Sequence, residues 1–568
     1  MKDKIEFYEI LERVSNRLYK EYHQLVGDFD FSRFFLKVNE PAAEGEATLF
    51  VLRVSQQTAG FPPFTYNSPV RRTALEDFLS RSLADAVDGL ASFSADGIAR
   101  RNIGVARPGQ QILPRTSMAV TEEYVEARIY VILPVRQDRI NGELAKQIFF
   151  EDLPTIVNAS LIFCNLDSTQ VDRVVDVMED ADQVRQLLST QGLVGFVSDS
   201  AMINRAGSSD LPDVQYQREL GVPEELLREV DVPNTDSVRG IGIPSGLTVI
   251  IGDDFSGRSP LMRALAMGIY NHVAGDGREF VITVPDAVYV AAERGRSAQR
   301  VDVSQFISSL PQGEDVTAYS TDFADPFLSQ VTSTVEMLEV GARVLLYDES
   351  DSASSFLSRD VRFDDTMGES NIKPLASVAR NLVDDLGVSV VVAGYNSISE
   401  FVPIADTVFQ IKDYQIREVT AQVKELGVEG LVGQDDDNSV MPLAERARWI
   451  VPSSIDPSSG REDVVIESLT DSKMQFGRTV IDLSSVHQIS DPHQAKTIAV
   501  IMAYVKDHYL EEARPMHEIL DLIDRDLSTE GLDCLTQELS GEHARPRRYE
   551  VAGAFNRLRT LRIGFAGE

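Results

Sequence analysis

The chain has 568 residues, is 43% hydrophobic and carries a formal net charge of −35 at pH 7. This length predicts about three or four domains, and the charge excludes a surface that binds nucleic acid throughout, because such a surface would repel phosphate. Apolar runs stay below the roughly 18 residues that a membrane span requires, so a membrane protein is not expected.

The excess of acids has two open explanations, an ordinary solvated acidic surface or an adaptation to high salt. The two cysteines, Cys164 and Cys534, lie far apart in the sequence. Two cysteines that lie so far apart in the sequence predict reduced thiols in a cytoplasmic protein.

The first section, residues 1–212, is predicted to be an α+β domain. A helical pattern opens the chain, residues 47–54 have a strand pattern, and residues 111–135 hold two alternating runs joined by Thr121-Glu-Glu, as in a hairpin. The loop composition of residues 207–212 marks its expected end. The section contains no motif that assigns a reaction.

The central section, residues 213–425, contains a candidate phosphate-binding loop. Leu247 to Ile251 has a strand pattern, and a helical pattern runs from Ser259 to about His272. Between them, Gly252-Asp-Asp-Phe-Ser-Gly257-Arg258-Ser259 fits G-x-x-x-x-G-K-[ST] except that the lysine is an arginine. Glycines let the backbone turn so that its N–H groups surround a phosphate at the N-terminus of a helix, which is the positive end of the helix dipole. The alternative is an ordinary tight turn between strand and helix.

No lysine occurs between Lys146 and Lys373, so no neighbour in sequence can replace the missing one. Arg258, or a residue distant in sequence, must carry the charge for the phosphates.

A second motif follows about 90 residues later. Four apolar or aromatic residues lead into Asp348-Glu349, where a buried strand would project Asp348 toward Mg²⁺ and Glu349 toward an attacking water. Alternating buried strands and helices predict a parallel sheet covered on both faces, which brings both motifs to its carboxyl edge. The alternative is a solvated strand end.

The last section, residues 426–568, begins with loop composition, as in residues 433–438, and ends in a helical tail with a basic cluster. On a helix, Arg548, Phe555, Arg559 and Arg562 share one face. This face either forms salt bridges with acidic neighbours or contacts RNA, and both alternatives stay open. The arginines of the cluster are Arg545, Arg547, Arg548, Arg557, Arg559 and Arg562.

Ordered segments over nearly the whole chain carry a family resemblance. They include Ala59-Gly-Phe-Pro62, Leu113-Pro-Arg-Thr-Ser117, Gly240-Ile-Gly-Ile-Pro-Ser-Gly246, Gly295-Arg-Ser297, Arg446-Ala-Arg448 and Ala544-Arg-Pro-Arg-Arg548. With the two motifs, the sequence resembles the predicted ATPases of the ATP-binding-cassette (ABC) class that are soluble and not linked to transporters. The resemblance implies an α/β P-loop core of the ABC nucleotide-binding type, with an N-terminal α+β domain and a C-terminal mainly helical domain.

The resemblance also implies ATP and Mg²⁺ as cofactors, with Ser259 and Asp348 on the metal and Glu349 as the catalytic residue. Nucleotide contacts are expected from Gly252, Ser256, Gly257, Arg258, Ser259, Arg296, Ser329 and Gln330. In cassette proteins a glycine-bearing signature segment caps the partner's γ-phosphate, which leaves a homodimer open.

This chain departs from the family pattern in the phosphate-binding loop and in the signature segment. Asp253 and Asp254 stand where the family's loop has glycines, and the signature segment aligns with residues 325–330, where Pro326 removes a donor N–H. Two functions therefore compete. One is an ATP-binding protein with slow or absent hydrolysis, and the other is a non-catalytic scaffold or RNA-interacting protein.

Overall fold

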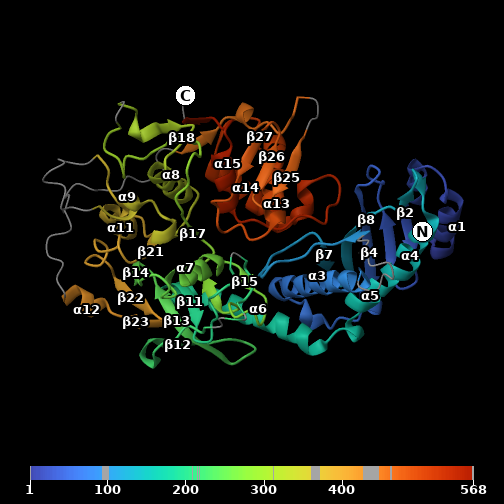
Figure 1. Cartoon of the computed structure of the whole chain (residues 1–568), viewed down its shortest axis with the longest axis horizontal. Helices are drawn as coiled ribbons and strands as arrows, with labels where there is room; N and C mark the ends of the chain where they lie inside the picture. The colour runs from blue at the N-terminus through green and yellow to red at the C-terminus, as the bar shows by residue number, and fades with distance from the viewer. Residues whose placement is uncertain are drawn as a thin grey trace. The chain divides into compact units, whose positions relative to one another are not determined.

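The computed structural model describes residues 2–91, 102–207, 209–213, 215, 218–310, 313–359, 371–425, 447–460 and 464–565. The chain divides into two compact units (Figure 1). The first comprises Met1–Glu179 with Thr536–Arg545, and the second comprises Asp180–Leu535 with Pro546–Glu568. In the described part of the chain, no helix is both long and apolar enough to cross a membrane.

The first unit is built on a seven-stranded sheet of order β1-β2-β3-β4-β8-β5, with β7 paired to β8. The longest pair, β4 and β8, is antiparallel over its full length, and β7 and β8 form the hairpin predicted around Thr121. The strands are β1 (Lys2–Asp3), β2 (Gly27–Asp30), β3 (Phe35–Val38), β4 (Ala47–Ser55), β5 (Ile103–Gly104), β7 (Met118–Val120) and β8 (Tyr124–Ile132).

Helices accompany this sheet, as expected for an α+β unit. They are α1 (Lys4–Val14), α2 (Gln56–Ala59), α3 (Pro69–Ala91), α4 (Gly142–Gln147), α5 (Leu153–Ser160) and the start of α6 (Ser168–Leu188). The buried Arg71 of α3 donates to Asp176 and Glu179 at 2.8 and 2.7 Å, which ties α3 to α6.

The second unit begins with an antiparallel sheet of order β12-β13-β11-β16. The strands are β11 (Leu193–Ser198), β12 (Leu227–Asp231), β13 (Ser237–Pro244) and β16 (Val281–Thr283). Because β11 pairs with both β13 and β16, residues 180–212 belong to the second unit and not to the first. The loop-like residues 207–212 therefore do not mark the end of a compact unit.

The second unit also contains a six-stranded sheet of order β17-β20-β21-β14-β22-β23, of which β14, β17, β21, β22 and β23 are labelled in Figure 1. Its strands are β14 (Leu247–Ile251), β17 (Ala287–Tyr289), β20 (Val344–Asp348), β21 (Ser389–Gly394), β22 (Thr407–Lys412) and β23 (Gln415–Glu418). All pairings are parallel except that of β22 with β23. These pairings confirm the predicted parallel sheet. Its near-continuous apolar strands are buried on both faces, as is usual for parallel sheets.

Helices α7 (Arg258–Met267), α8 (Pro326–Glu339), α9 (Ser354–Leu357), α11 (Leu375–Asp384) and α12 (Thr420–Glu425) belong to this part of the chain. Helix α7 ends five residues before the predicted His272, because the chain turns at Gly268. Helix α8 begins at Pro326, and Asp325 caps it by accepting from the Leu328 nitrogen at 3.0 Å.

The C-terminal part is mainly helical, as predicted. Helices α13 and α15 pack with the small sheet β25-β26-β27, and α14 packs against both of these helices (Figure 1). The elements are β24 (Arg448–Ile450), β25 (Ile466–Thr470), β26 (Lys473–Phe476), β27 (Thr479–Asp482), α13 (Pro492–His508), β28 (Arg514–Pro515), α14 (Met516–Thr529), α15 (Arg548–Arg557) and β29 (Ile563–Phe565). The predicted loop at residues 433–438 and Arg446 lie outside the described residues.

This C-terminal part shares one hydrophobic core with the parallel sheet. Leu247 and Val390 of the sheet belong to the same buried cluster as Met502 and Phe555. For this reason, the predicted domain boundary at residue 425 is not a boundary between compact units.

One prediction about the tail is wrong. Helix α15 ends at Arg557, and the next residue, Leu558, has φ −70° and ψ 111°, outside the helical region. Arg559 and Arg562 therefore lie beyond the helix and do not share a helical face with Arg548 and Phe555.

Candidate functional site

The loop from Gly252 to Ser259 connects the carboxyl end of β14 to the start of α7, as a phosphate-binding loop requires. Gly257 has φ 101°, and a Cβ atom there would lie 2.9 Å from the Tyr414 ring. A Cβ at Gly252 would lie 2.5 Å from the Ser256 hydroxyl. Both glycines are therefore required by the backbone path and the close packing of the loop.

Arg258 is buried and its side chain turns back under its own loop. Its Nη1 donates to the Gly252 carbonyl at 2.7 Å. The guanidinium also lies 3.7 Å from a carboxylate oxygen of Asp348 and 3.7 Å from one of Glu349. The arginine at the lysine position thus faces the two acids of the second motif.

Asp348 lies at the end of β20, fully buried, on the far side of β21 from β14. Its Oδ1 accepts from the Ser350 nitrogen at 3.0 Å, and the Ser350 hydroxyl lies 3.3 Å from that of Ser259. The Oδ2 atom is buried and has no hydrogen-bond partner in the described part of the chain. The structure therefore brings Ser259, Asp348 and Arg258 together, as predicted.

Glu349 is held by the turn that follows β21. Its Oε2 accepts from the backbone nitrogens of Tyr395 at 2.6 Å and Asn396 at 3.1 Å, and its Oε1 accepts from that of Ser397 at 2.8 Å. Partial burial works to raise the pKa of this carboxyl, but the hydrogen bonds outweigh it, so the pKa is lower than usual. Glu349 is thereby fixed as an anion.

An open pocket of about 520 Å³ lies against these residues and is lined by Asp253, Asp254, Arg258, Glu349, Ser350, Tyr395 and Asn396. Its charged lining consists of three carboxylates and one guanidinium. Tyr395 of this lining is 58% exposed, and Phe255, next to Asp254 in the loop, is 98% exposed. The pocket is therefore short of positive charge for a polyanion but offers exposed aromatic surface.

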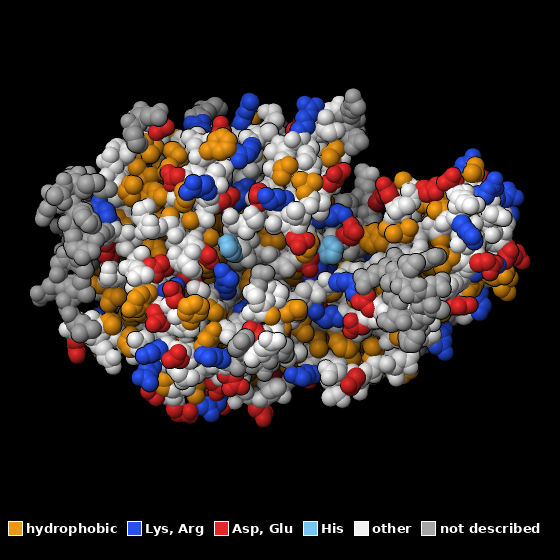
Figure 2. All heavy atoms as spheres, in the orientation of Figure 1, with side chains coloured by type: hydrophobic (Ala, Val, Ile, Leu, Met, Phe, Trp, Pro, Cys, Tyr) orange, Lys and Arg blue, Asp and Glu red, His pale blue; other side chains and the backbone are white. Residues whose placement is uncertain are grey.

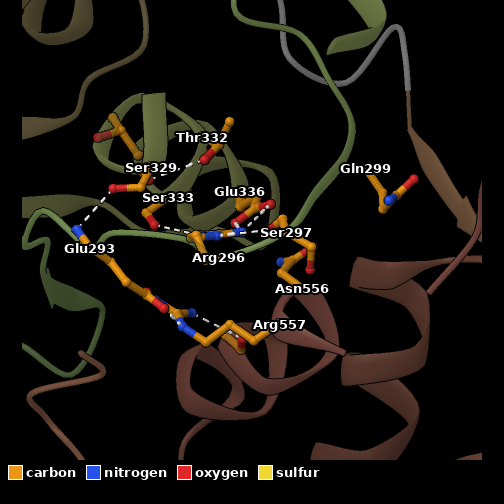
Figure 3. A network of polar contacts seen from close by, with 12 residues as sticks. Glu293, Arg296, Ser297, Gln299, Ser329, Thr332, Ser333, Glu336, Asn556 and Arg557 are labelled. Atoms are coloured by element: carbon orange, nitrogen blue, oxygen red, sulfur yellow. Dashed lines mark hydrogen bonds and ion pairs between the residues drawn. The ribbon is translucent and has the colours of Figure 1, made fainter. Parts of the chain in front are cut away.

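The structure does not bring Arg296, Ser329 and Gln330 to this pocket. All three are buried. Figure 3 shows Arg296 and Ser329 within a network of polar contacts. Arg296 donates to both carboxylate oxygens of Glu336 at 2.8 and 2.6 Å, and Ser329 accepts from the Glu293 nitrogen at 2.8 Å.

Gln330 instead braces the end of β20. Its amide nitrogen donates to the Ser352 hydroxyl at 2.9 Å, and that hydroxyl donates to the Asp348 carbonyl at 2.8 Å. Its amide oxygen accepts from the Ala353 nitrogen at 3.0 Å. These bonds position the Asp348 strand end from within the chain.

Most arginines of the predicted basic cluster have acidic or carbonyl partners. Arg547 pairs with Glu550, Arg548 with Asp521 at 2.8 Å, and Arg557 with Glu293 at 2.8 Å. Arg559 donates to the Asp322 and Gly295 carbonyls. On the face seen in Figure 2, basic and acidic side chains are interspersed and form no continuous basic area.

Three residues of the site were not among the candidate residues predicted from the sequence. Tyr395 and Asn396 belong to a turn whose composition resembles many loops, so only its position after a buried strand marks it. Tyr414 packs under the loop, where its nitrogen donates to the Ser256 carbonyl at 2.8 Å, and it has φ 64°. No glycine or motif signals that position.

Family models of known proteins match three segments of this chain. A family model of ABC ATPases described as the P-loop domain matches residues 167–447, and the model "ATPase of the ABC class N-terminal" matches residues 5–164. A third model, "MRB1590 C-terminal domain", matches residues 466–564.

Individual proteins are more distantly similar. The uncharacterized protein MJ1628 of Methanocaldococcus jannaschii is 24% identical over 327 residues, which cover 54% of this chain and 69% of that protein. A bacterial Atm1-family ABC exporter solved with ATP bound matches with 13% identity and a TM-score of 0.24. That match covers 51% of this chain, which spans half the length of the exporter chain.

Proposed function

Since the chain belongs to the family of ATPases of the ABC class, we propose that it binds ATP at the pocket beside Arg258 and hydrolyses it slowly or not at all. The proposal that the chain binds ATP rests on the loop from Gly252 to Ser259. Gly252 and Gly257 give it the backbone path of a phosphate-binding loop, and α7 begins within it at Arg258, without a side-chain cap.

The proposal that hydrolysis is slow or absent rests on one observation, the hydrogen bonding of the Glu349 carboxylate. Three backbone N–H groups occupy its carboxylate, which has about four acceptor positions, so little capacity remains to orient a water. The same bonds lower its pKa, which weakens it as a general base. Slow or absent turnover follows from both effects.

The residues predicted to hold Mg²⁺ do not fit that ion. A divalent cation on Asp348 would lie beside the buried Arg258 guanidinium, only 3.7 Å from the same carboxylate. Two cations at that spacing in a low-dielectric site repel strongly. No step of the proposed function therefore involves the metal.

A non-catalytic scaffold is the second candidate, and Asp253 and Asp254 favour it because they repel nucleotide from the pocket they line. RNA contact has support only from Arg559 and Arg562, which are exposed. A homodimer in which residues 325–330 cap the partner's nucleotide has no support from Ser329, which is buried in its own chain. The cytoplasmic location stays a prediction from Cys164 and Cys534, both free thiols.

The experiment that tests the proposal measures binding and turnover separately. Equilibrium dialysis with radiolabelled ATP gives the occupancy, and chromatography of the same samples gives the ADP formed. We expect saturable binding with little ADP, and no binding by Gly257→Ala, in which the new Cβ meets Tyr414. Absence of binding by the parent protein would favour the scaffold.

A further inference from the structure

We propose that the guanidinium of Arg258 takes the place of the divalent cation, so that nucleotide binding at this pocket does not depend on Mg²⁺. The inference rests on the proposed function, namely that ATP is the ligand. It concerns the identity of the positive charge that the phosphates meet.

The Arg258 guanidinium lies beside both acids of the second motif. Arg258 Nη2 lies 3.7 Å from Asp348 Oδ1, and Nη1 lies 3.7 Å from Glu349 Oε2. These two carboxylates are the acids that the sequence motif assigns to the metal and the water. The guanidinium is the cation between them.

The guanidinium is held in place by its own loop. The Gly252 carbonyl accepts from Nη1 at 2.7 Å, and only 7% of the side chain is exposed. Moving the guanidinium away from both acids would leave them uncompensated in a buried site. The charge is therefore a fixed part of the site and remains so without any added ion.

The guanidinium can also contact a ligand in the pocket. Arg258 is one of the residues that line the pocket of about 520 Å³, together with Ser350 and Asn396. A planar guanidinium presents several N–H donors and binds phosphate oxygens well, whereas an ammonium acts as a single point charge. Arg258 can thus hold its acids on one side and a phosphate on the other.

The Asp348 Oδ2 atom determines the result expected for Arg258→Lys. It is buried and has no hydrogen-bond partner among the described residues, so it is the atom that a metal would use. Lysine at position 258 lacks the fork that reaches both acids, and it would leave this carboxylate open to a cation. Arg258→Lys is therefore expected to create the metal dependence that the parent protein lacks.

Isothermal titration calorimetry with ATP, in excess Mg²⁺ and in EDTA, tests the inference. The parent protein is expected to bind with the same Kd in both buffers within about threefold, and Arg258→Lys is expected to bind at least about tenfold more tightly with Mg²⁺. Arg263→Lys is the matched control, because Arg263 lies on the same helix with 62% of its side chain exposed. It should behave as the parent does.

The parent measurement decides the inference even if Arg258→Lys does not fold. Parent affinity that falls about tenfold or more in EDTA overturns the inference and leaves the proposed ATP site standing. Absence of ATP binding in both buffers overturns the proposed function, and the inference with it.

Discussion

Glu349 accepts a hydrogen bond from the backbone nitrogen of Tyr395 at 2.6 Å, which fastens the end of β20 to the turn after β21. The predicted catalytic acid is therefore also a structural acceptor. Replacing it changes both the chemistry and the turn.

Glu349→Gln is expected to remove any ATP hydrolysis while leaving ATP binding in place, because an amide does not accept a proton from water as a carboxylate does. The amide nitrogen also faces backbone N–H groups, which costs about 1–3 kcal/mol of unfolding free energy. Hydrolysis and melting temperature are measured on the same preparation. Turnover at the parental rate would show that another base acts.

The same residue gives a pH dependence of known sign. Because the folded pKa lies below the ordinary value of 4.5, Glu349 contributes its full stability above that pH. This contribution is lost as the pH falls through the folded pKa. The melting-temperature difference between parent and Glu349→Gln should therefore shrink below about pH 4.5.

Most of the fold could be predicted from the sequence. Leu247–Ile251 is β14 to the residue, and the parallel sheet with both motifs at its carboxyl edge is confirmed. Buried parallel strands give long apolar runs, which periodicity detects. The unit boundaries could not be predicted, because they depend on the long-range pairing of β11 and on a core shared with Met502 and Phe555.

Only part of the candidate site could be predicted from the sequence. The loop motif located Arg258, but no pattern shows that its side chain turns inward to Asp348 and Glu349. The alignment of residues 325–330 with a signature segment suggested Ser329 and Gln330, yet burial in α8 turns both side chains into the chain's own interior. Side-chain direction depends on tertiary packing, which one sequence does not display.

Asp253→Asn with Asp254→Asn is expected to tighten ATP binding. Both side chains are exposed and line the pocket, so each removed charge contributes at most about 1 kcal/mol, or roughly fivefold in Kd. Calorimetry on the double variant measures the change. Because salt screens exposed charges, the gain should fall at high salt, and a gain independent of salt would point to another cause.

Glu76→Gln tests a partly buried acid of the first unit. Glu76 accepts from the Val120 nitrogen at 2.9 Å, and burial raises its pKa to about 7. Between the ordinary value of 4.5 and about 7 the unfolded chain loses this proton before the folded one, so rising pH destabilises the parent.

The glutamine variant cannot ionise. It should therefore gain stability relative to the parent as the pH rises from 4.5 to 7, measured as melting temperature across that range. Glu122→Gln, at an exposed position of the neighbouring turn, is the matched control. A difference for Glu76→Gln that does not vary with pH would contradict the assignment.

Tail arginines are expected not to bind single-stranded RNA at physiological salt, because Arg547, Arg548 and Arg557 are engaged by acids. Filter binding at several salt concentrations measures this for the parent and for Arg559→Ala with Arg562→Ala, two exposed positions. Salt-sensitive binding by the parent that the double variant loses would establish the RNA interaction instead.

The melting temperature of the parent protein in a titration with ATP tests the central claim most directly. Adenosine, which lacks phosphates, is the matched ligand. A loop that binds phosphates predicts a rise with ATP, worth about 2.7 kcal/mol at 100 times Kd, and no rise with adenosine. A melting temperature that ATP leaves unchanged up to millimolar concentrations, or that adenosine raises equally, would contradict the assignment of Gly252 to Ser259 as a phosphate site.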